Sequence, residues 1–282
     1  MKAIEESIVI DGLPWNILPS GAGSPVVFLH NGGGNLWNWA HQLEHFSSRH
    51  RVIAADLPGF GRSQRPSGPL RLGDYVEGVA GLLKALDLDR PVLVGNCIGA
   101  SIALEYALRQ PGAVRALALF NLCGGIPMLT PGLRFWSGLR PRTRLGRALH
   151  RCLIEVAGHP FLRPLNSRLI YAAGEPALHP DLRRFLDKER RNPGLRPSLH
   201  PLVMGLDSFS VFSRPREKPK GFPPVLLGWG KQNRTLDVKW AGFIADWLAP
   251  DRLCLIEQAG HMASYEQPGV VNESLEHFFD AV

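Results

Sequence analysis

Cys97 lies in a sequence pattern that can make a cysteine chemically reactive. Residues 92–100 read Val-Leu-Val-Gly-Asn-Cys-Ile-Gly-Ala, an apolar run that leads through a G-x-C-x-G turn into a predicted helix ending near Gln110-Pro111. Glycines two positions before and after the cysteine leave room for a sharp, strained turn. A cysteine at a helix N-terminus meets a partial positive charge that favours its thiolate. We therefore predict that Cys97 is a nucleophile, whereas the other three cysteines lack this context and are expected to be inert.

The strand, turn and helix around Cys97 resemble the nucleophile elbow of the α/β-hydrolase superfamily, where the nucleophile is most often a serine. The resemblance covers residues 6–124 and 222–280 and includes Asp56-Leu57-Pro58-Gly59-Phe60-Gly61-Arg62-Ser63, in which we interpret Asp56 as structural. It implies an α/β fold, with a mostly parallel eight-stranded sheet, helices on both faces and an inserted helical cap.

The resemblance also implies a base and an oxyanion hole. His261 follows Gly260 directly after the predicted last strand, where the family carries its catalytic histidine, and is expected to be the general base. The backbone N–H groups of Ile98, next to the nucleophile, and of Gly32, in the glycine-rich loop 30–34, are expected to stabilise an oxyanion. Neither a cofactor nor a metal is expected at such a site.

The third member of the expected triad departs from the family pattern. Relatives carry an aspartate in a Gly-x-x-Asp sequence after the penultimate strand, whereas the corresponding residues here are Gly230-Lys231-Gln232-Asn233. An asparagine can orient an imidazole beside a cysteine, as in papain-like Cys-His-Asn proteases, so we assign Asn233 to this role. Three alternatives stay open: Asp237 four residues further on, Asn121 at the end of an earlier strand, and Asp207 in the cap.

Short apolar runs bounded by Gly, Pro, Asn or Asp predict the strands that position these residues. Residues 8–10 and 15–18 flank Asp11-Gly12, a pair that favours a tight hairpin. The remaining strands are predicted at residues 26–29, 52–55, 92–94, 116–120, 225–227 and 253–256, and the clearest helix at 74–86. From about residue 125 to 220 the strands stop and prolines interrupt the helices. We therefore predict a core of residues 1–124 and 221–282 and a helical cap of residues 125–220.

The positive charge of the chain is concentrated in the predicted cap. Residues 130–220 contain 18 Lys or Arg and 7 Asp or Glu, a local charge of +11, so the rest of the chain sums to −4 within the total of +7. A field of this sign attracts anions. We expect a small-molecule substrate, and the field leaves two interpretations open: an anionic or carrier-bound substrate, with an acyl carrier protein as a candidate partner, or a solvated basic face that binds no ligand. Nucleic acid is disfavoured because no nucleic-acid motif accompanies the arginines.

Composition excludes several other classes of protein. Hydrophobic residues make up 45% of the chain and charged residues 20%, which is typical of a globular protein and not of a disordered or fibrous one. The cysteines are scattered without C-x-x-C spacing, which disfavours a zinc site or a disulfide framework. No apolar run reaches about 20 residues and the first residues include two glutamates, so we expect no membrane span, no signal peptide and a cytoplasmic location.

These residues favour attack by Cys97 on an ester or thioester of a small, partly hydrophobic molecule, through an acyl-thioester intermediate. Two alternatives remain. The replacement of serine and aspartate by Cys97 and Asn233 also fits a natural-product lyase that eliminates a carboxylate such as acetate from an O-acylated substrate. Asn96 is similar to the asparagine in the Gly-Asn-Ser-x-Gly elbow of carbon–carbon bond hydrolases. A non-catalytic binding protein with the same fold is a further class, because fold does not determine function.

Overall fold

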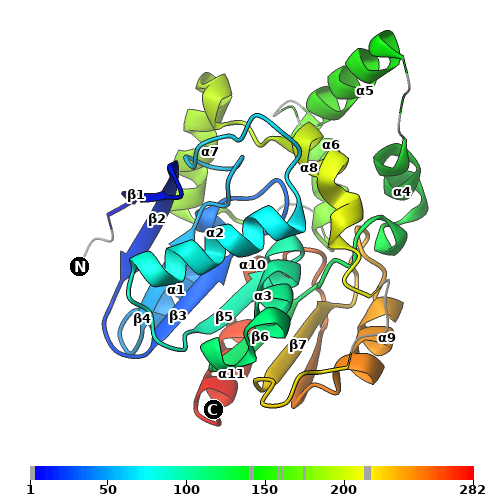
Figure 1. Cartoon of the computed structure of the whole chain (residues 1–282). Helices are drawn as coiled ribbons and strands as arrows, with labels where there is room; N and C mark the ends of the chain where they lie inside the picture. Colours follow the sequence, from blue (N-terminus) through cyan, green and yellow to red (C-terminus); the bar gives the residue numbers. More distant parts are fainter. Residues whose placement is uncertain are drawn as a thin grey trace.

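A mostly parallel eight-stranded sheet runs through the centre of the molecule (Figure 1). The computed structural model describes residues 4–139, 141, 143–157, 159, 162–173, 176–212 and 217–282; residues 1–3 and several short stretches of the predicted cap lie outside this description. The strands are β1 (Glu6–Ile10), β2 (Leu13–Ser20), β3 (Pro25–Leu29), β4 (Arg51–Ala55), β5 (Val92–Asn96), β6 (Ala116–Phe120), β7 (Val225–Gly230) and β8 (Arg252–Ile256).

The order of the strands is β1-β2-β4-β3-β5-β6-β7-β8. β2 pairs antiparallel with β1 and with β4, and every pair from β4 to β8 is parallel. Asp11 and Gly12 connect β1 to β2 with φ of 47° and 78°, which is the left-handed backbone that a tight hairpin requires. The predicted α/β fold, its eight strands and its N-terminal hairpin are confirmed.

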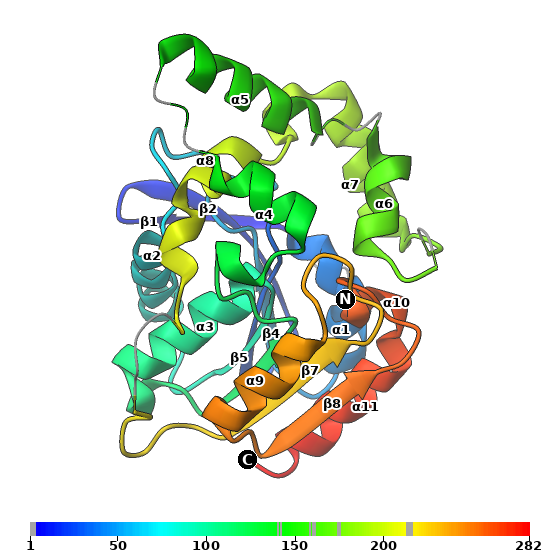
Figure 2. The same ribbon diagram turned by 90° about the vertical axis from the view of Figure 1, so that its right-hand side faces the viewer.

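Helices cover both faces of the sheet, because the central strands bury side chains in both directions. α2 (Leu72–Ala85), α3 (Ile98–Arg109) and α9 (Lys239–Leu248) pack on one face against residues such as Val27. α1 (Ala40–Phe46) and α11 (Pro268–Phe279) pack on the other face against residues such as Phe28. Figure 2 shows these two layers from the side.

Among the described residues, five α-helices between β6 and β7 lie beyond the carboxyl ends of the strands (Figure 2). They are α4 (Pro131–Gly138), α5 (Arg144–Ala157), α6 (Arg163–Ile170), α7 (Pro180–Arg191) and α8 (Leu199–Gly205). All eight strands lie outside residues 125–220, which agrees with a helical cap, although the boundaries of the three segments remain a prediction. None of the described helices combines the length and apolar composition needed to cross a bilayer.

Parallel strands end at a common edge, and the expected site residues follow those ends. Gly32 lies after β3, Cys97 after β5, Asn233 after β7 and His261 after β8. The crossover connections therefore bring together residues that are up to 229 positions apart in sequence.

Candidate active site

Cys97 stands on a strained turn between β5 and α3. Its φ and ψ are 56° and −114°, a positive φ that a residue with a side chain rarely adopts. Its backbone N–H donates to the carbonyl of Phe120, 3.0 Å away on neighbouring β6. A Cβ added at Gly95 would collide with the backbone of the first turn of α3, and one at Gly99 would collide with the carbonyl of Leu29. The two glycines thus allow the helix to approach the sheet closely enough to form the turn.

Two backbone N–H groups point at the sulfur of Cys97. They belong to Gly32, in the loop after β3, and to Ile98, the first residue of α3. The loop is held by His30, whose Nδ1 donates to the carbonyl of Asn31 at 2.7 Å and whose Nε2 accepts the N–H of Leu57 at 2.9 Å. The structure brings both predicted oxyanion donors to the predicted nucleophile.

Cys123 lies beside Cys97 and shares a hydrogen bond with it. Both thiols are buried. This hydrogen bond, followed by burial, raises the pKa of Cys97 well above its ordinary value, while the N–H groups of Gly32 and Ile98 act in the opposite direction. The thiol, not the thiolate, is therefore the resting form, in contrast to the expectation from the helix N-terminus alone. Cys123 was expected to be inert, and no local sequence signal marks it, because it reaches the site through the pairing of β5 with β6.

His261 is buried in the loop after β8, with 4% of its surface exposed. Its backbone N–H donates to the carbonyl of Ile170, 2.7 Å away at the end of cap helix α6. Glu266 holds the same loop by accepting the N–H groups of Gly260 at 2.7 Å and of Ala172 at 2.6 Å. Burial lowers the pKa of His261 to about 4, so the ring is neutral at physiological pH.

Asn233 is the residue that contacts the imidazole. Its Nδ2 lies 3.2 Å from Nδ1 of His261 and 3.0 Å from Oδ1 of Asn121. Its Oδ1 accepts the backbone N–H groups of Thr235 at 2.9 Å and of Leu236 at 3.0 Å. The amide of Asn233 faces the ring with its nitrogen, and its role in orienting the ring stays a prediction.

The alternatives to Asn233 do not contact the ring. Asn121 donates from Nδ2 to the backbone carbonyl of His261 at 3.1 Å, and thus holds the loop. Asp237 accepts the N–H of Lys239 at 3.0 Å beside the start of α9, and Asp207 is exposed in a 3-10 helix of the cap. Neither aspartate affects the pKa of His261, which burial lowers.

Asn96, next to the nucleophile, is a further member of the site. Its Nδ2 donates to the carbonyl of His261 at 3.0 Å, and its Oδ1 accepts Nδ2 of Asn121 at 3.0 Å. The sequence marks Asn96 only by its place in the elbow and assigns it no role, because its hydrogen-bond partners cannot be read from the sequence.

The surroundings of the two thiols are largely apolar. A Cβ added at Gly32 would lie 2.7 Å from Cδ2 of Leu202, and one at Gly33 would lie 3.4 Å from Cδ2 of Leu199, so cap helix α8 covers the oxyanion loop. Met128 and Phe212 lie against Gly124, next to Cys123. Within the described residues, no three His, Cys, Asp or Glu side chains are grouped as a metal site.

Asp56 is part of the framework around the site. Its carboxylate accepts the N–H of Leu36 at 2.7 Å, the N–H of Arg62 at 2.9 Å and Nδ2 of Asn16 at 2.8 Å. Burial raises its pKa to about 6 despite these hydrogen bonds. The contacts agree with the structural interpretation of this residue, since those with Leu36 and Asn16 join the loop after β4 to neighbouring segments and that with Arg62 closes the loop on itself.

Comparisons with known proteins agree with this architecture. Residues 24–141 match the family model described as alpha/beta hydrolase fold. The chain is 40% identical over 143 residues to 2-hydroxy-6-oxo-2,4-heptadienoate hydrolase of Pseudomonas putida, a match that covers 49% of this chain and 51% of that protein. It is 28% identical over 280 residues to 2-hydroxymuconate semialdehyde hydrolase of Pseudomonas sp. strain CF600, covering 93% and 89%.

Solved structures with the same fold include a bacterial membrane phospholipase A, at 25% identity and a TM-score of 0.73, which covers 99% of this chain and 86% of that one. The epoxide hydrolase CorEH superposes with a TM-score of 0.78 over 99% of both chains, and its 19% identity shows the fold alone. The chain has the α/β-hydrolase fold.

Proposed function

We propose that this chain is a hydrolase that uses Cys97, His261 and Asn233 on an ester or thioester of a small, partly hydrophobic molecule. The observation that carries the proposal is the convergence of the Gly32 and Ile98 N–H groups on the sulfur of Cys97 at its strained turn. Such donors stabilise the negative charge that develops on a carbonyl oxygen under attack. The hydrolases among the relatives support the same reaction class.

The proposed reaction proceeds through a covalent intermediate. The sulfur of Cys97, after losing its proton, bonds to the carbonyl carbon, and the carbonyl electron pair moves to the oxygen beside Gly32 and Ile98. When the C=O bond re-forms, the leaving group departs and an acyl thioester remains. Water then adds to this thioester and the C–S bond breaks, which releases a carboxylic acid and the thiol. Nε2 is the ring nitrogen of His261 that does not face Asn233.

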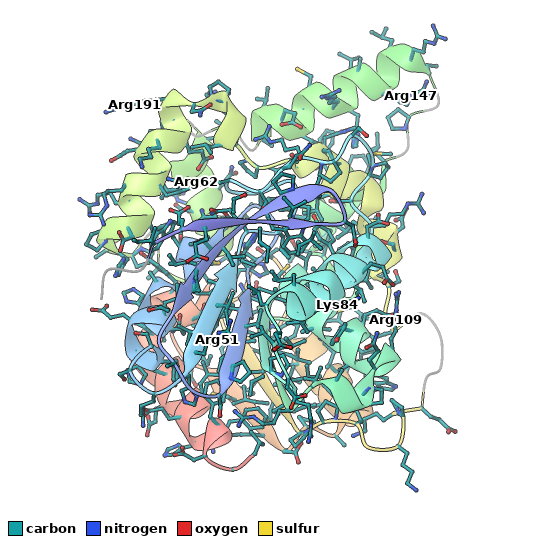
Figure 3. The ribbon with its side chains drawn as sticks, turned by 60° about the vertical axis from the view of Figure 1, so that its left-hand side comes forward. Arg51, Arg62, Lys84, Arg109, Arg147 and Arg191 are labelled. Carbon is teal, nitrogen blue, oxygen red and sulfur yellow. The ribbon has the colours of Figure 1, made fainter. Side chains whose placement is uncertain are left out.

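The surroundings of the site support the proposed substrate class. Leu199 and Leu202 of α8 over the oxyanion loop favour an apolar acyl group. The basic residues of the cap, among them Arg147 on α5 and Arg191 on α7 at its outer edge in Figure 3, favour an anionic or carrier-bound acyl donor. An acyl carrier protein is one partner that would present such a donor.

Intact-protein mass spectrometry tests the proposal. Wild type, Cys97→Ala and the control Cys152→Ala, which changes an exposed cysteine, are exposed to a panel of acyl esters and acyl thioesters. We expect an adduct of acyl mass on wild type and on Cys152→Ala but not on Cys97→Ala. An equal adduct on all three proteins, or no adduct on any of them, would contradict the role of Cys97.

Carbon–carbon bond hydrolysis is the second candidate, because the two relatives above are named as hydrolases of 2-hydroxy-6-oxo-2,4-heptadienoate and of 2-hydroxymuconate semialdehyde. Incubation with a 2-hydroxy-6-oxo-dienoate in ¹⁸O-water tests it, since hydrolysis places labelled oxygen in the carboxylic acid product. Elimination of a carboxylate has no structural observation of its own and stays a prediction from sequence.

A further inference from the structure

Three buried asparagines link the nucleophile turn to the imidazole. Asn96, Asn121 and Asn233, called here the asparagine chain, follow one another through hydrogen bonds of 3.0 Å each, and Asn233 continues to Nδ1 of His261 at 3.2 Å. An amide donates hydrogen bonds from its nitrogen and accepts them at its oxygen, so the orientation of each amide decides whether the neighbouring group accepts or donates.

Backbone N–H groups determine these directions, because they can only donate. The N–H of Gly230 lies 3.1 Å from Oδ1 of Asn121, and those of Thr235 and Leu236 lie 2.9 and 3.0 Å from Oδ1 of Asn233. If the amide of Asn233 were rotated by 180°, its NH₂ would face two N–H donors and its oxygen would face the oxygen of Asn121. The rotated arrangement loses three buried hydrogen bonds, so the nitrogen of Asn233 is the atom that faces His261.

The imidazole must therefore accept at Nδ1. One hydrogen of Asn233 Nδ2 goes to Asn121 and the other goes to Nδ1 of His261, which leaves the proton of the neutral ring on Nε2. In a triad with an aspartate the roles of the two ring nitrogens are reversed, because Nδ1–H donates to the carboxylate and Nε2 stays free as the base. His30 illustrates that other tautomer in this chain, since its Nδ1 donates to a carbonyl and its Nε2 accepts an N–H.

We propose that the asparagine chain holds His261 in the Nε2–H tautomer, which makes the ring a hydrogen-bond donor rather than a base and restricts the site to acyl donors with weakly basic leaving groups, namely thioesters and aryl esters. This inference rests on the proposed function and names its substrate class.

The restriction follows from the proton balance. An Nε2–H ring has no free lone pair for the proton of Cys97, and it cannot give its own proton away without becoming an imidazolate. The thiol proton therefore goes to solvent, and the leaving group must depart as an anion. A thiolate departs readily because the pKa of a thiol is about 8.5, whereas an alkoxide or an amide anion is far more basic. The raised pKa of Cys97 and the lowered pKa of His261 agree with a resting pair of neutral groups.

NMR of the full chain labelled with ¹⁵N-histidine reads the tautomer directly. His261 is assigned by the loss of its signals in His261→Asn. We expect a protonated Nε2 and an unprotonated Nδ1 at pH 7 in wild type. A protonated Nδ1 would overturn the inference.

Asn233→Asp replaces the donor by an acceptor at the same distance from the ring, and Asn233→Ala is the control that removes the donor without adding an acceptor. Formation of the acyl adduct is timed with a thioester and an alkyl ester of the same acid. In wild type the adduct should form much faster from the thioester than from the alkyl ester, and the ratio of these two rates is the preference of the enzyme. Asn233→Asp should move the proton to Nδ1 and narrow this preference by about 10²-fold, the usual range of general acid–base catalysis, whereas Asn233→Ala should not narrow it.

The two proposals fail separately. If wild type has the Nε2–H ring but forms no acyl adduct with any donor, the proposed function is refuted and the inferred tautomer is confirmed. If the acyl adduct forms equally fast from the thioester and the alkyl ester, the role of Cys97 as nucleophile is confirmed. The restriction to weakly basic leaving groups is then refuted. If Asn233→Asp does not fold, the tautomer and the preference of wild type still decide the inference.

Discussion

Acidification should destabilise this protein through the buried histidines His30 and His261. Burial lowers the pKa of both His30 and His261 from 6.5 to about 4. Between these pH values the unfolded chain binds protons on these histidines that the folded chain does not bind. Their contribution to the free energy of unfolding is therefore fully present above pH 6.5 and is lost as the pH falls toward 4. Asp56 acts oppositely, because burial raises its pKa from 3.8 to about 6 and the folded chain binds its proton first.

The size of the effect follows from linkage. From pH 7 to pH 5 each histidine lowers the free energy of unfolding by about 2 kcal/mol, because one pKa unit corresponds to about 1.4 kcal/mol. Protonation of Asp56 raises it by about 1 kcal/mol over the same range. Together, these three groups should lower the free energy of unfolding by roughly 3 kcal/mol over these two pH units.

Urea unfolding at pH 7, 6 and 5, followed by tryptophan fluorescence and by circular dichroism, measures this change. His261→Asn should remove about 2 kcal/mol of the pH dependence, since an amide cannot titrate in this range. His277→Gln, which replaces an exposed histidine of α11, is the matched control for the substitution.

An equal pH dependence in wild type and His261→Asn would refute the reasoning. It would mean that His261 binds a proton in the folded chain as readily as in the unfolded chain. The lowered pKa of His261 in the folded chain would then be wrong.

Other substitutions test the packing of the site. Gly99→Ala should destabilise the chain by about 1–3 kcal/mol in urea unfolding, because its Cβ would collide with β3, and unchanged stability would contradict the close approach of α3. Gly32→Ala should slow acylation of Cys97 by about 10²-fold or more by displacing an oxyanion donor, and Leu202→Ala should partly restore the rate by relieving the 2.7 Å contact. Cys123→Ala should shift the pH profile of Cys97 alkylation to lower pH, since it removes the hydrogen bond that raises that pKa; an unchanged profile would exclude the coupling.

The elements of the core were predictable because their signals are local. Each parallel strand is a short apolar run between breaking residues, and burial on both faces requires that composition wherever the strand lies in the sheet. The turn at Cys97 was predictable for a similar reason, since the collisions that exclude side chains at Gly95 and Gly99 leave glycine as the residue at both positions.

The environment of Cys97 was not predictable in the same way. The helix N-terminus alone indicated a lowered pKa, whereas the structure adds Cys123 as a hydrogen-bond partner and burial beneath the cap, and both raise it. A residue 26 positions away supplies the decisive contact, and its position depends on the pairing of β5 with β6.

The sequence by itself determined the fold, the strained turn and the residue types available for chemistry, because these depend on steric and hydrophobic patterns within short segments. Only the tertiary structure decided which end of the Asn233 amide faces His261. That direction depends on N–H groups of Gly230, Thr235 and Leu236, and on the oxygen of Asn121 from another strand. The same asparagine could have left the imidazole a base or made it a donor, and the arrangement of the surrounding hydrogen bonds selects the donor.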